Sequence, residues 1–135
     1  MFITRGERMN NIMVCVTRQK TCQRLIDYGR ALMESEEDRL FVIHVARENE
    51  NFLGNREEGE ALEFLYEKAK KAGASLTVER SSDVLKTLAD IAEKNDVNRV
   101  VAGQSGENGQ GAGFLDKLER RLSGKADLVV LPAVS

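Results

Sequence analysis

The chain has 135 residues, of which 41% are hydrophobic, and its 20 basic and 22 acidic side chains give a formal net charge of -2 at pH 7. A chain of this length can bury enough apolar surface to fold as one domain without disulfides or metals. The mixed charge excludes the basic stripe of a nucleic-acid-binding protein, and no apolar run approaches the roughly 20 residues that span a bilayer. We therefore expect a cytoplasmic protein with no nucleic acid and no membrane among its partners.

Five short apolar runs rich in β-branched residues alternate with four longer segments of helical period, which is typical of β-α-β units around a parallel sheet. The runs are continuously apolar, as in strands that are covered on both faces. They are residues 11–16, 39–45, 75–79, 98–103 and 127–132. We predict an open five-stranded parallel sheet with helices on both faces, a Rossmann-like α/β fold. Residues 11–135 form one domain in this interpretation, and residues 1–10 form a disordered extension.

Each of the four segments between the runs places its apolar residues on one helical face. Thr21 and Asp83 are predicted N-caps, Gly73 is a predicted C-terminal stop, and Pro132 is expected to end the last strand. The polar, glycine-marked segment 46–59 is predicted to be a mobile loop. The apolar faces comprise Cys22, Leu25, Ile26, Gly29, Leu32 and Met33; Ala61, Leu62, Leu65, Ala69 and Ala72; Val84, Leu85, Leu88, Ile91 and Ala92; and Leu115, Leu118 and Leu122.

Two cysteines and one histidine are the candidates for reactive side chains. Cys15 and Cys22 are seven residues apart, which matches neither a zinc pair nor a redox CxxC motif, so we expect both to pack as thiols. We expect His44 to be packed or hydrogen-bonded rather than catalytic. No paired acids and no Ser-His-Asp set indicate general acid-base or nucleophilic chemistry. The sequence predicts no catalytic residue and no metal site beyond a nucleotide-bound Mg²⁺.

A glycine-rich segment, "GQSGENGQGAGF", follows the fourth apolar run at residues 103–114. Backbone N–H groups of such a loop can converge on an anion where the loop enters a helix. In open parallel sheets, ligands bind outside the carboxyl ends of the strands, where this segment is expected to lie. Its spacing excludes the dinucleotide-binding motif, and "SGK" at residues 123–125 lacks the preceding glycine of a Walker loop and precedes a strand. A phosphate-binding loop and a slack connection both remain open at this point.

The chain resembles the universal stress protein family over almost all of residues 11–131. "VVAGQSG" matches the first half of the glycine pattern of the ATP-binding branch, with Gly103 and Gly106 two residues apart. "FVIHVARE" is similar to the second strand of that family. Gly113 and Phe114 stand nearest to the glycine-hydroxyl pair of the second half, three residues early and without the hydroxyl. "VCVT" and "CQRLIDYGRAL" look more like the stress-protein-like domain of bacterial potassium-sensing histidine kinases.

The resemblance implies a regulatory domain with an adenine nucleotide alpha hydrolase-like fold, which binds ATP or another adenine nucleotide and acts in signalling and the stress response. It also implies a homodimer through the last strand and a signalling partner protein. A nucleotide-free, dimeric interaction module of the same fold is the alternative. The predicted nucleotide-binding residues are Val16, Thr17, Arg18, Val45, Ala102, Gly103, Gln104, Ser105, Gly106, Gly113 and Phe114.

Overall fold

The computed structural model describes residues 9–104 and 111–132. Five parallel strands form one sheet in the order β3-β2-β1-β4-β5. Each of the five predicted apolar runs is a strand, so the predicted open parallel sheet is confirmed. The strands are β1 (Asn11–Cys15), β2 (Arg39–Ala46), β3 (Ser75–Arg80), β4 (Arg99–Gly103) and β5 (Asp127–Leu131).

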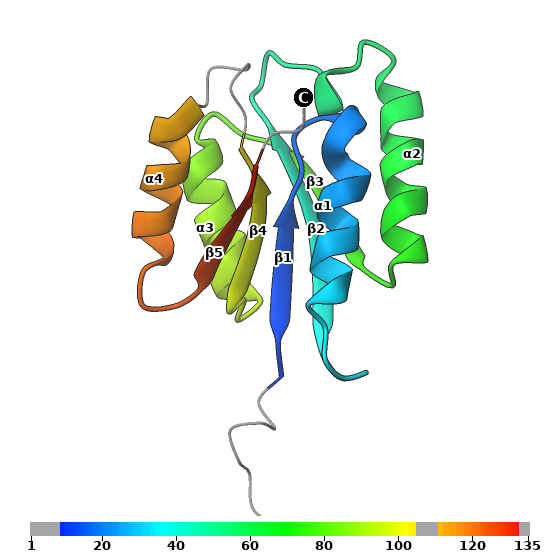
Figure 1. The fold of residues 1–135 in the computed structure, drawn as a ribbon. Helices are drawn as coiled ribbons and strands as arrows, with labels where there is room; N and C mark the ends of the chain where they lie inside the picture. The colour runs from blue at the N-terminus through cyan, green and yellow to red at the C-terminus, as the bar shows by residue number, and fades with distance from the viewer. Residues whose placement is uncertain (1–8, 105–110, 133–135) are drawn as a thin grey trace, which may run out of the picture.

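Helices cover both faces of the sheet, as the alternating pattern predicts. Figure 1 shows α1 and α2 on one side of the strands and α3 and α4 on the other. A short 3-10 helix, η2 (Phe52–Gly54), lies in the connection from β2 to α2. None of the helices within residues 9–104 and 111–132 is long and apolar enough to cross a membrane. The helices are α1 (Gln19–Ala31), α2 (Glu58–Lys71), α3 (Val84–Lys94) and α4 (Gly111–Leu122).

The central strand β1 is buried along its whole length because helices pack on both of its faces. Ile12 and Val14 belong to the core under α1 and α2, whereas Met13 and Cys15 belong to the core under α3 and α4. The prediction that both cysteines are core thiols is confirmed, since Cys15 and Cys22 are buried and free. Burial raises the pKa of Cys15 to about 12, so this side chain is a neutral thiol at physiological pH.

Four residues were predicted to begin or end helices and strands; three of these predictions are confirmed and one is wrong. Asp83 caps α3 and accepts a hydrogen bond of 3.1 Å from the Lys86 N–H. Gly73 follows α2 with a φ of +75°, the left-handed conformation that glycine adopts without a Cβ penalty. Strand β5 ends at Leu131, directly before Pro132. Thr21 is not an N-cap, because α1 begins two residues earlier, at Gln19.

Asp38 fastens the amino-terminal ends of β1 and β2 to each other. Its carboxylate accepts hydrogen bonds from the backbone N–H groups of Asn10, Glu34 and Ser35, at 2.9, 2.7 and 3.2 Å. Burial by itself raises the pKa of Asp38, but these hydrogen bonds and the Asn10 side chain outweigh burial and lower the pKa to about 2. The ionised carboxylate therefore stabilises the folded state.

We expect Asp38→Asn to lower the free energy of unfolding at pH 7 by about 2 kcal/mol, because the neutral amide presents an N–H₂ group to backbone donors. The greater stability of wild type over Asp38→Asn depends on a pKa of Asp38 in the folded state that is below the ordinary value of 3.8. It should persist above that pH and shrink as the pH falls toward 2. Urea denaturation of both proteins between pH 7 and pH 2 measures this difference, and a difference that does not change with pH would contradict the assignment.

Candidate functional site

The carboxyl ends of β1, β2 and β4 meet at the place where the strand order reverses. The chain runs outward from β1 to β2 and β3, and then crosses to the other side of β1 to form β4 and β5. In open parallel sheets, ligands bind at this switch point. Val16, Val45 and Gly103 lie there, at the ends of three adjacent strands. The structure thus brings together predicted site residues that are far apart in the sequence.

The first of two cavities at this edge is an apolar cleft between the sheet and helices α3 and α4. Its volume of about 40 Å³ has room for a few water molecules, and its lining includes the partly exposed Phe114 and Leu115. Six of the predicted nucleotide-binding residues line it. The lining residues of this apolar cleft are Cys15, Val16, Thr17, Ile43, Val45, Val84, Leu88, Ala102, Gly103, Phe114, Leu115 and Leu118.

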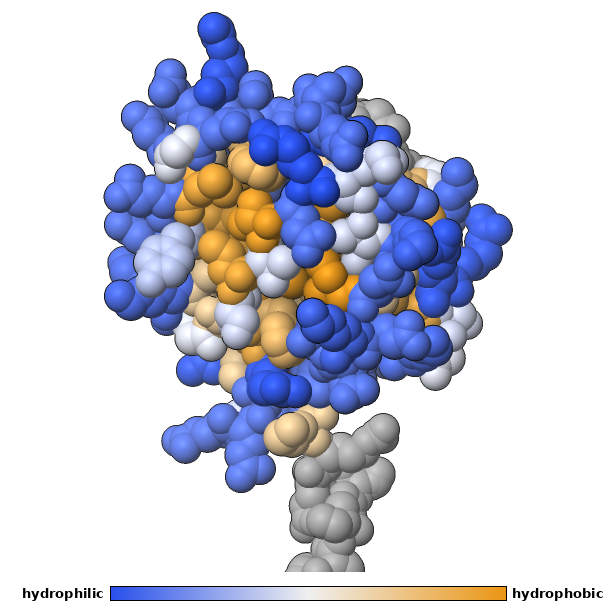
Figure 2. All heavy atoms as spheres, turned by 180° about the vertical axis from the view of Figure 1, so that it is seen from behind, coloured by the Kyte–Doolittle hydropathy of each residue, from blue (hydrophilic) through white to orange (hydrophobic). Residues whose placement is uncertain are grey.

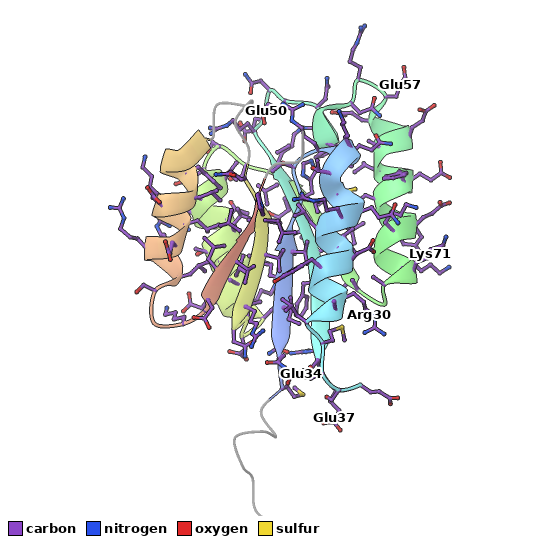
Figure 3. The ribbon with its side chains drawn as sticks, in the orientation of Figure 1. Arg30, Glu34, Glu37, Glu50, Glu57 and Lys71 are labelled. Carbon is purple, nitrogen blue, oxygen red and sulfur yellow. The ribbon has the colours of Figure 1, made fainter. Side chains whose placement is uncertain are left out.

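The second cavity is a polar hollow of about 280 Å³ that lies beside the apolar cleft and shares Thr17 and Val45 with it. Arg18 enters it from the start of α1, and Glu50 enters it from the connection between β2 and α2. Figure 3 shows Glu50 at the carboxyl end of the sheet, on the opposite end of the molecule from Arg30 and Lys71. The lining residues of this polar hollow are Thr17, Arg18, His44, Val45, Ala46, Asn49, Glu50, Asn51 and Gly54.

His44 joins β1, β2 and η2 through both of its ring nitrogens. Nδ1 lies 2.8 Å from the carbonyl oxygen of Val16, and Nε2 lies 2.8 Å from the backbone nitrogen of Leu53. A carbonyl can only accept and an N–H can only donate, so the imidazole is neutral with its proton on Nδ1. With both nitrogens engaged, His44 is a hydrogen-bonded structural residue, as predicted.

Burial lowers the pKa of His44 below its ordinary value of 6.5. The hydrogen bond to Val16 and the carboxylate of Glu50 oppose this shift, whereas the positive charge of Arg80 adds to it. Protonation of Nε2 would remove the acceptor for the Leu53 N–H, so the neutral form of His44 belongs to the folded state.

The connection between β2 and α2, predicted as a mobile loop, contains η2 and is fastened by several side chains. Glu58 accepts a hydrogen bond of 3.0 Å from the Phe52 N–H and an ion-paired hydrogen bond of 2.6 Å from Arg80. The Arg80 guanidinium lies 3.9 Å from the centre of the Phe52 ring. The Asn55 side chain donates to Gln19 at 2.8 Å. These contacts favour one conformation of the connection, and the mobility predicted for residues 46–59 stays a prediction.

The glycine-rich segment is described only at its two ends. Ser105 and Gly106 lie outside the described residues. Gln104 lines neither cavity, and its backbone N–H donates to the Leu131 carbonyl at 2.8 Å. The prediction that the loop extends to Gly113 is wrong, because α4 already begins at Gly111. Helix formation there is supported by the packing of Phe114 and Leu118 against the sheet.

The site residues that come from the connection after β2 and from the start of α3 were not predicted from the sequence. Asn49, Glu50 and Asn51 come from the connection after β2, and Val84 comes from the first turn of α3. The signal for the first three was available, since a run of polar residues directly after a buried strand lies at the ligand-binding edge of a parallel sheet. Within the described ranges, no group of three His, Cys, Asp or Glu side chains is placed to hold a metal ion.

No protein-family model matches this sequence, and no curated protein is significantly similar to it. Solved structures do share its architecture. A universal stress protein in complex with cAMP superimposes with a TM-score of 0.61 at 16% identity, over 90% of this chain and 95% of that one. The chain has the fold of the universal stress proteins.

Two further universal stress proteins support this fold assignment. One from Archaeoglobus fulgidus has a TM-score of 0.62 at 14% identity and matches 94% of this chain, which spans 45% of that longer protein. UspA from Lactobacillus plantarum has a TM-score of 0.53 at 15% identity, over 92% of this chain and 98% of that one. The universal stress protein fold thus covers almost the whole chain.

Proposed function

We propose that this chain is a universal stress protein-like regulatory domain that binds an adenine nucleotide at the edge formed by β1, β2 and β4. The observation that carries the proposal is the pair of adjoining cavities at the topological switch point, one apolar and one polar. A nucleotide has the same division into an apolar base and a polar sugar phosphate. The cAMP carried by one structural neighbour supports the same ligand class.

The proposed role is that of a switch rather than a catalyst. The cleft contains one thiol, Cys15, whose raised pKa keeps it neutral, and the hollow contains one histidine, whose two nitrogens are already engaged. Ligand binding would displace Phe114 and so alter the surface at the start of α4 that a signalling partner reads. We further propose a signalling context, from the resemblance that "VCVT" and "CQRLIDYGRAL" have to the domain of potassium-sensing kinases.

The direct test is the ligand content of the purified protein. The protein is denatured, the released small molecules are separated and identified, and the ligand-free protein is then titrated with ATP, AMP and cAMP by calorimetry. An adenine nucleotide in the released fraction, or saturable heat below millimolar ligand, supports the proposal. Absence of both would refute it.

Thr17 is the best position for a blocking substitution, because it is exposed and borders both cavities. We expect Thr17→Trp to weaken adenine nucleotide binding at least tenfold, since the indole fills the space that both cavities share. The free energy of unfolding should change by less than about 0.5 kcal/mol, as is usual at exposed positions.

Lys71→Trp is the matched control. It places the same ring on an exposed position at the far end of α2 (Figure 3). Calorimetric titration of the two variants should show wild-type affinity for Lys71→Trp only. Equal affinity in both variants would place the ligand elsewhere on the molecule.

A nucleotide-free interaction module is the second candidate function, and exposed apolar surface favours it. Strand β5 is an edge of the sheet, and its Val130 side chain is 37% exposed. On the face turned away in Figure 1, Figure 2 shows an uncovered apolar area ringed by hydrophilic side chains. Such surfaces are typical of protein interaction sites. A homodimer through β5 that contains no nucleotide and binds none in the titration would establish this function instead.

A further inference from the structure

The polar hollow contains one positive and one negative side chain that face a shared space. Arg18 and Glu50 both line it, one from the start of α1 and the other from the connection after β2. A guanidinium only donates hydrogen bonds and a carboxylate only accepts them, so the two groups require different partners. Thr17, Asn49 and Asn51 add groups that can do both.

Neither charged group is fully engaged within the described part of the chain. Arg18 has no carboxylate within ion-pair distance among the described residues. Its Nη1 lies beside Gly54, where an added Cβ would be in ordinary van der Waals contact with it at 3.8 Å. Glu50 accepts a 3.3 Å hydrogen bond from the Arg47 N–H, and its other oxygen forms a long, exposed ion pair of 3.9 Å with the Arg47 Nε. Oxygen lone pairs of Glu50 thus remain free for a ligand.

We propose that the polar hollow is a ribose-phosphate subsite, in which Glu50 accepts hydrogen bonds from ribose hydroxyls and Arg18 binds a single phosphate. The inference rests on the proposed nucleotide-binding function and adds the ligand class, an adenosine monophosphate with free ribose hydroxyls. A carboxylate can accept hydrogen bonds from two vicinal hydroxyls. A guanidinium can donate two parallel hydrogen bonds to a phosphate. The negative charge of Glu50 disfavours a polyphosphate in the same hollow.

Thr17 and Val45 determine where the base lies in this arrangement. They border both cavities, so a sugar in the polar hollow continues directly into the apolar cleft. The base would enter the cleft by displacing Phe114, which is partly exposed. Glu50 and Arg18 therefore distinguish ligands that differ in their ribose hydroxyls or phosphate, whereas the apolar cleft recognises the base.

The test compares, within each protein, the affinity for AMP with the affinity for an analogue. A variant that is merely less stable would lose affinity for all ligands alike and keep these ratios. Calorimetric titrations use AMP, adenosine, and dideoxy-AMP, which lacks both ribose hydroxyls. Wild-type protein should bind AMP about tenfold more tightly than either analogue, the usual worth of a charge-assisted hydrogen bond. Glu50→Gln should abolish the preference for AMP over dideoxy-AMP, and Arg18→Gln should abolish the preference for AMP over adenosine.

The controls are Glu57→Gln and Arg30→Gln, which remove the same charges at exposed positions that line neither cavity. Figure 3 shows Glu57 at the start of α2, apart from Glu50, and Arg30 at the far end of α1. Both controls should keep the wild-type ratios. Tight AMP binding with ratios near one, or ratios that Glu50→Gln and Arg18→Gln leave unchanged, would overturn the subsite and leave the proposed function standing. Failure of all three ligands to bind would overturn the subsite, and failure of ATP and cAMP to bind as well would overturn the proposed function.

Discussion

Replacing His44 by alanine should lower the free energy of unfolding at pH 7.5 by about 3 kcal/mol. The substitution leaves the Val16 carbonyl and the Leu53 N–H without their partner, and each buried unpaired group costs about 1 to 3 kcal/mol. His44→Gln should recover part of the loss, because its amide still offers one donor and one acceptor. Urea denaturation measures all three proteins, and equal stability of wild type and His44→Ala would contradict the assigned hydrogen bonds.

The same two hydrogen bonds predict how stability depends on pH. Because the pKa of His44 is lowered in the folded state, the unfolded chain takes up a proton first as the pH falls below the ordinary value of 6.5. Wild-type stability should therefore fall below that pH, by up to about 1.4 kcal/mol per pH unit until the folded-state pKa is reached. His44→Gln should lack this dependence between pH 7.5 and pH 5.5, and parallel pH profiles of the two proteins would count against a neutral His44.

Alanine at Gly29 should destabilise the protein by about 2 kcal/mol although alanine is the better helix former. Gly29 lies in α1 against the sheet, where a Cβ would stand 2.4 Å from Val14 Cγ2 and 3.2 Å from Leu40 Cδ1. Overpacking of this kind costs about 1 to 3 kcal/mol or more, which exceeds the helix-propensity gain of about 1 kcal/mol. The helix must move away from β1 to accept the methyl group.

Gly59→Ala in the first turn of α2 is the matched control, since a Cβ there meets nothing within 4 Å. It should leave stability unchanged or raise it by up to about 1 kcal/mol. Thermal denaturation should therefore show a lower midpoint for Gly29→Ala and an unchanged or higher midpoint for Gly59→Ala. Two stabilising substitutions would show that α1 does not pack as closely on β1 as the structure has it.

Most of the fold could be predicted from the sequence because parallel strands and the helices beside them leave strong local patterns. The continuously apolar runs around Val14 and Val42 indicate strands that are buried on both faces, and they are. The prediction of Thr21 as an N-cap was wrong because the first turn of α1 carries no apolar residue before Cys22. The hydrophobic pattern therefore begins later than the helix. Gly113 was placed in a loop because glycine is a poor helix former, a preference that packing of the rest of α4 outweighs.

The candidate site could be predicted only in part, because its second half depends on the conformation of one connection. The strand-end residues Val16, Thr17 and Val45 follow from the parallel arrangement alone. Leu53, with a φ of +55°, donates its N–H to His44 and so lies next to two residues that line the polar hollow, His44 and Gly54. A positive φ at leucine has no local sequence signal, and the contact that stabilises it joins residues nine apart.

The most direct measurement of nucleotide binding at this edge is a titration of isotope-labelled protein with AMP, followed through the backbone amide signals. The account predicts saturable shifts concentrated at Thr17, Arg18, Val45, Glu50 and Gly103, which come from the ends of three strands and the connection after β2. Amides at the opposite end of the sheet, around Asp38 and Lys71, should not move. No shifts at millimolar AMP, or shifts concentrated at that opposite end, would contradict the account.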